Sequence, residues 1–239
     1  MKTQVNRVNA LVLTTDLQGY TGFAAHPDST EYTLNYVEFV NKCIGVLFNG
    51  GNPWWTTTMY YESIAKPTNN WLGDGNQMIW PEEAFSGLNI MNLVNRLRDF
   101  SINFDKINEK YSLKNPGLMH LPEKIRFGLS QGPIQVFKPD KSKWEYSNSG
   151  VIEWGGYACN FSAKLQCYCR DLSFLASARM VGIEKAMLKD NFYRRAVATR
   201  LPGMGPEIVF AYEVEYEALS PQVRDKYFGP FGMITERGK

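Results

Sequence analysis

A strand that ends in a carboxylate is the feature of this sequence that most constrains its fold and chemistry. Residues 8–15 are rich in valine, leucine and threonine, a composition typical of a buried strand. Asp16 follows directly, and a turn containing Gly19 then precedes a helical pattern. A carboxylate at the partly dehydrated end of a strand is costly unless it meets a cation. Taken alone, the pattern fits either a cation or phosphate site at this strand end or a carboxylate that caps the turn.

The remaining periodicities alternate between strand and helix along the chain. The expected elements after the first strand are a helix around 37–47, a hairpin within 54–80, a helix over 81–114, strands over 124–130 and 133–138, a strand over 144–154, a helix over 155–171 and a strand over 208–216. This order predicts an α+β fold in which helices cover one face of a mainly antiparallel sheet.

Composition limits the possible partners of the chain. The 239 residues are 44% apolar and 21% charged, and they are expected to form a single domain over 1–239 with its own core. A formal net charge of only +2 excludes a strong overall attraction to nucleic acid or to membrane surfaces. The apolar run at 10–13 is too short for a membrane span, so we expect a cytoplasmic protein.

The cysteines do not form a metal-binding pattern. They stand at positions 43, 159, 167 and 169, without a C-x-x-C pair, and the two histidines are distant in sequence. We expect them to be buried, reduced thiols.

A second carboxylate, Asp74, lies in the Gly73-Asp74-Gly75 turn of the predicted hairpin. Taken alone, such a residue is more commonly a simple turn residue. If Asp16 and Asp74 converge, however, two carboxylates of this kind suit hard divalent cations that also hold phosphate oxygens. The turn after Asp16 offers backbone N–H groups at Gly19, Tyr20 and Thr21, which is a candidate phosphate-binding arrangement.

Four segments occur in the order seen in one known enzyme family. These segments are TTDLQGYTGF, WLGDGNQMIW, IRFGLSQGPIQVF and GGYACNFSAKL. They resemble the first metal motif, the second metal hairpin, the R-x-G-[IL]-x-x-G-P segment and the asparagine-helix motif of the class III nucleotidyl cyclases. The resemblance implies a ferredoxin-like βαββαβ core with additional strands and helices. It also implies a catalytic domain that stands alone, without a receptor, membrane or coiled-coil segment.

The resemblance also assigns roles to particular residues. Asp16, Asp74 and the Leu17 carbonyl would hold two divalent cations, Mn²⁺ or Mg²⁺. Asn160 would orient the ribose, and Lys164 stands where the family has an arginine. A lysine supplies charge but not the two-pronged geometry of arginine. Family members form each active site between two chains, so a homodimer is implied.

In this family, two further positions recognise the base of the nucleotide. At both positions, the residue in this chain differs from the residues usual in adenylate and guanylate cyclases. Asn70 stands where adenylate cyclases have lysine and guanylate cyclases have glutamate, and Glu153 stands where adenylate enzymes have aspartate. Because a pocket must satisfy the buried edge of its base, altered donors and acceptors indicate a different base. The chain is similar to the bacterial pyrimidine cyclases of Pycsar antiphage systems. Those enzymes make cyclic UMP or cyclic CMP for a separate effector, and UTP is slightly favoured over CTP here.

Several alternatives remain open from the sequence alone. The chain could be an adenylate or guanylate cyclase with divergent base selectors, or an inactive domain that only binds a nucleotide. The aromatic insert over 49–70 could be buried in an edge hairpin, or it could narrow the base pocket toward a pyrimidine. The basic residues Arg194 and Arg195 are expected on a solvated helix face, and residues 202–207 in a tight turn.

Overall fold

Strand β1 (Val5–Gln18) is a long interior strand of the sheet in this computed structural model. The structure describes residues 5–26, 31–56, 60–85, 90–118, 120–137, 153–180 and 183–229. Strand β1 pairs antiparallel with β3 (Asn76–Pro81) on one side and with β4 (Lys124–Phe137) on the other. The predicted strand over 8–15 is therefore confirmed, and it is longer than the sequence indicated.

The described strands form one sheet in the order β2-β3-β1-β4-β6-β8-β7-β9, and β5 pairs with β4. Among the described strand pairs, β4 and β6 alone run parallel. The order β2-β3-β1-β4, with α2 between β1 and β2 and α4 and α5 between β3 and β4, is that of a ferredoxin-like core. The other strands are β2 (Thr68–Trp71), β5 (Glu153–Gly156), β6 (Phe174–Ser177), β7 (Tyr193–Ala198), β8 (Glu207–Tyr212) and β9 (Phe228–Gly229).

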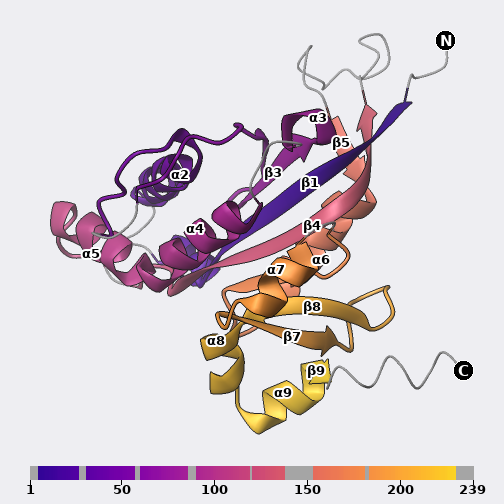
Figure 1. Cartoon of the computed structure of the whole chain (residues 1–239). Coiled ribbons are helices and arrows are strands. Elements are labelled where there is room, and N and C mark those ends of the chain that lie inside the picture. Colours follow the sequence, from indigo (N-terminus) through magenta and orange to yellow (C-terminus); the bar gives the residue numbers. More distant parts are fainter. Residues whose placement is uncertain are drawn as a thin grey trace, which may run out of the picture.

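Helices cover both faces of this sheet (Figure 1). The helices are α1 (Tyr20–Ala25), α2 (Thr33–Asn49), α3 (Glu82–Phe85), α4 (Ile90–Ile102), α5 (Phe104–Lys114), α6 (Tyr157–Tyr168), α7 (Ile183–Lys189), α8 (Glu213–Ala218) and α9 (Pro221–Tyr227). The ferredoxin-like helices α2, α4 and α5 lie on one face of the sheet, as the sequence predicted. Helix α6 lies on the other face, so the expectation that all helices cover one face is wrong.

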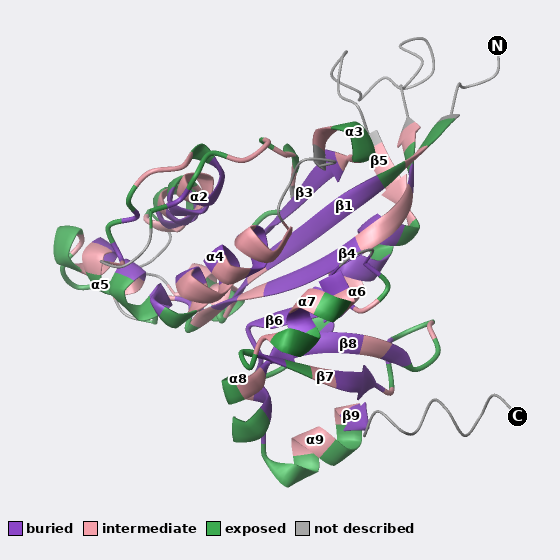
Figure 2. Ribbon diagram, viewed as in Figure 1, coloured by how far each residue is buried: buried purple, intermediate pink, exposed green. Residues whose placement is uncertain are grey.

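The alternation of side chains along β1 explains this two-sided packing. Leu11 and Leu13 belong to the large core cluster beneath α2, α4 and α5, whereas Val12 packs with Ala158 and Cys159 of α6. Successive side chains of a strand point to opposite faces, so β1 is buried on both (Figure 2). The α+β class and the mainly antiparallel sheet are thus confirmed.

Three expected elements differ from the structure. The hairpin expected over 124–138 is one continuous strand, β4, because Gly132 continues the ladder opposite Ala10 instead of turning the chain. The helix expected over 81–114 is interrupted, and α5 starts anew after Asn103. The strand expected over 208–216 ends at Tyr212, and residues 213–216 lie in α8. Most of the strand expected over 144–154 falls outside the described residues.

No helix in the described ranges is long and apolar enough to cross a membrane. The cysteines there are all unpaired, and Cys167 is exposed while the other three are buried. The expectation of buried thiols is therefore wrong for Cys167.

Candidate active site

Asp16 and Asp74 come together at one end of β1. Asp16 lies two residues before the end of β1, and Asp74 lies in the turn between β2 and β3. Burial raises the pKa of Asp74, and the negative charge and a hydrogen bond of Asp16 raise it further. The convergence of the two predicted metal ligands is therefore a feature of the structure.

Gly75 makes this convergence possible. A Cβ atom built on Gly75 would lie 2.0 Å from the carbonyl oxygen of Thr15, which no side chain can tolerate. The turn therefore lies directly against the strand that carries Asp16. This close approach gives the Asp-Gly pair a role beyond that of a simple hairpin turn.

Arg126 is a member of the site that the sequence analysis did not assign. It lies directly opposite Asp16 in the β1–β4 ladder, and its guanidinium forms an ion pair with the Asp16 carboxylate. The Nε–H of Arg126 is buried and has no hydrogen-bond partner among the described residues. The arginine of the R-x-G segment was the available signal, but only the strand register places it at Asp16.

The Leu17 carbonyl is directed to the same side as Asp74. The Gln18 carbonyl accepts a hydrogen bond of 2.9 Å from the Glu123 N–H, on the β4 side of β1. Successive carbonyls of an antiparallel strand point to opposite sides, so that of Leu17 points toward β3. The β1–β3 ladder ends at the Thr15–Asn76 pair, so this carbonyl lies beyond the last paired residue.

The turn after Asp16 leads into α1 through Gly19. Gly19 has a φ of 89°, a left-handed conformation that favours glycine, and it precedes the first residue of the helix. The N–H groups of Tyr20 and Thr21 have no acceptor within the helix because they belong to its first turn. Burial and the nearby charge of Asp74 raise the pKa of Tyr20, so this turn lies close to the two aspartates.

Asn160 and Lys164 lie on the outward face of α6. The residues of this helix that face the sheet are buried, whereas Asn160 is exposed and Lys164 is half-buried. The Lys164 ammonium lies beside the turn at Gly203, where an added Cβ would be 3.3 Å away. Within the described part of the chain, neither residue contacts Asp16 or Asp74. One protomer therefore does not bring all the predicted site residues together.

Asn70 shares a face of the sheet with α6. It lies opposite Gln77 in the β2–β3 ladder, and Gln77 donates a hydrogen bond to the Cys159 carbonyl of α6. Directly opposite residues of antiparallel strands point to the same face. Glu153 begins β5 opposite Phe137, three residues before the glycine that caps α6, and its side chain lies outside the described structure.

Two aromatic side chains of the insert, Trp55 and Tyr61, are buried on the other face of the sheet, whereas Trp54 and Tyr60 are exposed. Trp55 and Tyr61 are almost fully buried in the core cluster that contains α2, α4 and α5. Trp55 packs edge-on against Phe100, and the Tyr61 hydroxyl donates to Asp99 over 2.6 Å. Trp55 and Tyr61 therefore belong to the core and do not narrow a base pocket near α6. Within the described part of the insert, an isolated bridge between Gly51 and Tyr61 stands in place of an edge hairpin.

The donor set at the β1 end fits a hard divalent cation. Two carboxylates converge there, and a directed backbone carbonyl adds a third oxygen. In the described ranges, no group of three or more side chains from the usual metal-binding types surrounds one point. That result is compatible with Mg²⁺ or Mn²⁺, since Mg²⁺ is commonly held by one or two carboxylates together with substrate phosphates and water.

Solved structures identify the fold to which this arrangement belongs. The adenylyl cyclase CyaB from P. aeruginosa superimposes with a TM-score of 0.58 at 13% sequence identity, covering 87% of this chain and 95% of that chain. The guanylyl cyclase Cya2 gives a TM-score of 0.56 at 16% identity, covering 89% and 94%. The chain has the fold of a nucleotide cyclase catalytic domain. No protein-family profile and no curated protein sequence matches it.

A third solved structure extends the match along nearly the whole chain. A bacterial light-regulated adenylyl cyclase gives a TM-score of 0.57 at 14% identity, covering 94% of this chain and 58% of that chain. The cyclase fold therefore includes the ferredoxin-like core and the strands beyond it. At these identities the likeness concerns the fold alone.

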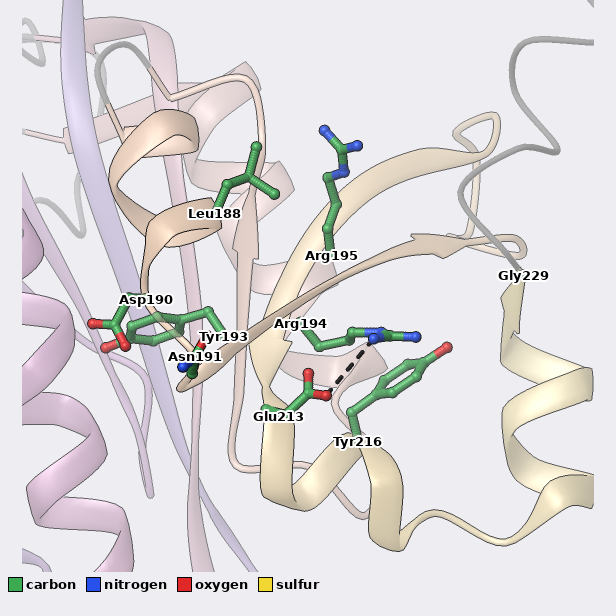
Figure 3. Close-up of a pocket in the computed structure, with 9 residues that line it drawn as sticks. All are labelled: Leu188, Asp190, Asn191, Tyr193, Arg194, Arg195, Glu213, Tyr216 and Gly229. Carbon is green, nitrogen blue, oxygen red and sulfur yellow. Dashed lines mark ion pairs between the residues drawn. The ribbon is translucent and has the colours of Figure 1, made fainter.

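A cavity of about 610 Å³ lies elsewhere in this cyclase fold, between β7, α8 and Gly229 (Figure 3). None of the predicted site residues lines it. The Arg194 guanidinium lies beside the Glu213 carboxylate and the Tyr216 ring, and Arg195 pairs with Glu184. Both arginines lie in a strand, so the expectation of a solvated helix face is wrong.

The turn expected at 202–207 is confirmed up to Pro206, and β8 begins at Glu207.

The raised pKa of Asp74 predicts how pH affects the stability of the metal-free protein. A carboxyl whose pKa is higher in the folded state contributes stability below its unfolded pKa, and this contribution is lost as pH rises through the folded value. With EDTA present, the free energy of unfolding of the wild type should therefore fall, relative to Asp74→Asn, as pH rises from 4 to 7. Thermal unfolding of both proteins measures this difference.

Divalent cations should reverse this loss. Mg²⁺ or Mn²⁺ at about 100 times its Kd should stabilise the wild type by about 2.7 kcal/mol, since the ion binds only the folded protein. Asp74→Asn should gain much less. Equal stabilisation of the two proteins by the ion would contradict the assignment of Asp74 as a ligand.

Proposed function

We propose that this protein is a metal-dependent nucleotidyl cyclase whose catalytic domain spans the chain. The observation that carries the proposal is the convergence of Asp16, Asp74 and Arg126 at the end of β1, in a cyclase fold. The reaction would convert a nucleoside triphosphate to its 3′,5′-cyclic monophosphate and pyrophosphate. Retention of both carboxylates favours an active enzyme over an inactive nucleotide-binding domain.

The proposed chemistry is an in-line displacement at the α-phosphorus. The ribose 3′-oxygen loses its proton and bonds to phosphorus, while the bond to the bridging oxygen of the β-phosphate breaks. Divalent cations, when bound, lower the pKa of the 3′-hydroxyl and stabilise the developing negative charge. Asp16, Asp74 and the Leu17 carbonyl would hold these ions, and Gly19, Tyr20 and Thr21 would approach the phosphates through their backbone.

Arg126 is placed to act on the same phosphates. Its guanidinium pairs with Asp16 and the side chain is 23% exposed. A phosphate oxygen bound beside Asp16 would accept a charge-assisted hydrogen bond from the exposed part of this guanidinium. This role would give the arginine beside the two carboxylates a function in substrate binding.

The placement of α6 supports an active site shared between two chains. Asn160 and Lys164 face away from the sheet, whereas the aspartates lie at the end of β1. We therefore propose a homodimer in which one chain supplies Asp16 and Asp74, and the other supplies Asn160 to orient the ribose and Lys164 to stabilise the transition state.

The base selectors favour a pyrimidine substrate. Asn70 is half-buried on the α6 face and offers both a donor and an acceptor, and Glu153 offers acceptors only. The aromatic insert no longer contributes to this argument, so it rests on these two residues and on the resemblance to pyrimidine cyclases. We propose UTP as the substrate slightly ahead of CTP, with an antiphage second messenger as the product and a separate effector as its receiver.

Incubation with Mn²⁺ and each of ATP, GTP, CTP and UTP in turn tests this function. Cyclic UMP or cyclic CMP is the expected product. A purine product would leave the cyclase proposal intact and contradict the base assignment.

Exchange of the base selectors should shift the substrate preference. Asn70→Lys combined with Glu153→Asp restores the pair found in typical adenylate cyclases, and it should raise kcat/KM for ATP relative to UTP by at least about tenfold. Asn69→Lys is the matched control, because Asn69 lies opposite Met78 on the other face of the sheet. An unchanged ratio in the double variant would contradict the roles of Asn70 and Glu153.

A further inference from the structure

A buried polar network joins the first half of α6 to the strands beneath it. Such a helix–sheet interface is usually apolar, yet Thr14, Gln77, Ser130 and Ser162 are all buried there. Each of the three central strands contributes one of these side chains: β1 carries Thr14, β3 carries Gln77 and β4 carries Ser130. The cyclase chemistry proposed above uses none of these four side chains.

The hydrogen bonds in this network form a closed set. Ser162 Oγ donates to the Cys159 carbonyl over 3.0 Å, so the Thr14 hydroxyl donates to Ser162 Oγ over 2.7 Å. Gln77 Nε2 lies 3.3 Å from Thr14 Oγ1 and 3.1 Å from the Cys159 carbonyl oxygen, and it donates to both. Ser130 Oγ donates to the Ala158 carbonyl over 2.7 Å. The Gln77–Thr14 bond joins β3 to β1, and the other four bonds end on residues 158–162 in the first half of α6.

The network connects the two halves of the proposed catalytic machinery. Thr14 precedes Asp16 by two residues, Gln77 follows Asp74 by three, and Ser162 follows Asn160 by two. Directional bonds fix the height and rotation of a helix over a sheet more narrowly than apolar contacts do. Gly128 adds to this constraint, because a Cβ built on it would lie 2.0 Å from the Ser162 carbonyl oxygen.

We infer that Thr14, Gln77, Ser130 and Ser162 are positioning residues that hold Asn160 in register with the metal aspartates of the same chain. This inference rests on the proposed function. In a dimer with shared sites, the aspartates of one chain serve one active site and its Asn160 serves the other. The network therefore links the two active sites through the interior of each protomer.

A pair of substitutions at Thr14 tests this role. Thr14→Val keeps the shape and removes the hydroxyl, and it should lower kcat by about tenfold to a hundredfold while KM changes by less than about twofold. Thr14→Ser keeps the hydroxyl and should retain wild-type kcat. Ser173→Ala is the control, because its hydroxyl is also buried but has no partner among the described residues. Equal kcat values for Thr14→Val and Thr14→Ser would overturn the inference.

A probe on Cys167 gives a second readout that does not depend on turnover. Cys167 is the exposed cysteine, and it lies on the outward face of α6, seven residues after Asn160. A trifluoromethyl label there should show a ¹⁹F resonance that shifts when Mg²⁺ is added to the wild type or to Thr14→Ser. The shift should be lost in Thr14→Val, and also in Asp74→Asn because the ion no longer binds.

The two readouts separate the inference from the proposed function. If the wild type makes no cyclic nucleotide, the proposed function fails, and the label still reports whether α6 responds to the metal site. If the ¹⁹F chemical shift of the wild type does not change when Mg²⁺ is added, the inference is overturned. If Thr14→Val does not fold, Ser130→Ala replaces it in both measurements.

Discussion

Asp74→Ala should abolish cyclic nucleotide formation, with a fall in kcat of at least about a thousandfold, a loss of the size seen when a charge-stabilising group is removed. The substitution removes one of the two converging carboxylates that would hold the divalent cations, so the charge stabilisation that the ions would supply to the phosphates is lost. The Gly75 contact with the Thr15 carbonyl remains, and the turn should therefore keep its backbone shape. Initial rates with Mn²⁺ and UTP or CTP measure the effect.

Asp105→Ala provides the matched control for this experiment. Asp105 is an exposed carboxylate in the first turn of α5, on the opposite side of the core from α6. It should retain wild-type activity. If Asp74→Ala still cyclises at the wild-type rate, Asp74 is only a turn residue and the metal assignment is wrong.

Mixing two inactive variants should restore activity. Asp74→Ala and Asn160→Ala each damage both active sites of a homodimer. A mixed dimer, however, contains one site with an intact aspartate pair from one chain and an intact Asn160 from the other. When equal amounts are refolded or exchanged together, half of the dimers are mixed and each has one working site of two. We therefore expect about a quarter of wild-type activity, as two-fold symmetry requires.

The control for complementation is a mixture in which both substitutions lie in the same chain. The double variant Asp74→Ala/Asn160→Ala mixed with wild type gives dimers in which each site lacks one of the two residues. These mixed dimers should be inactive, so only the wild-type dimers, a quarter of the total, contribute. Failure of the two single variants to recover any activity would contradict a site shared between chains.

The parts of this site that depend on local sequence could be predicted. Asp16 follows a strongly β-forming run and Asp74 lies in an Asp-Gly turn, so both placements depend on a few neighbouring residues. Asn160 and Lys164 are four residues apart on one helix, which fixes their common face. In the structure the two aspartates lie close together, and Asn160 and Lys164 lie on the outward face of α6.

The parts that depend on long-range pairing were missed. Arg126 joins the site only through its register with Asp16, a pairing between residues 110 positions apart. The Gln131-Gly132-Pro133 segment has the composition of a turn, yet it continues β4. A Cβ on Gly132 would lie 3.2 Å from the Tyr157 ring, so this glycine allows the start of α6 to approach the strand.

The role of the aromatic insert stayed open from the sequence because composition does not reveal which face of a sheet a loop covers. Trp55 and Tyr61 have large apolar side chains, and such side chains occur both in ligand pockets and in hydrophobic cores. Contacts with Phe100 and Asp99 of α4 decide the question in favour of the core. That placement leaves Asn70 and Glu153 as the residues on which the base assignment depends.

The most direct test of a pyrimidine-specific cyclase is a competition among the four triphosphates. Purified protein is incubated with Mn²⁺ and an equimolar mixture of ATP, GTP, CTP and UTP, and the cyclic products are identified by mass. We predict cyclic UMP or cyclic CMP as the principal product, with its formation lost in EDTA. Absence of any cyclic nucleotide, or a predominance of cyclic AMP or cyclic GMP, would contradict this prediction.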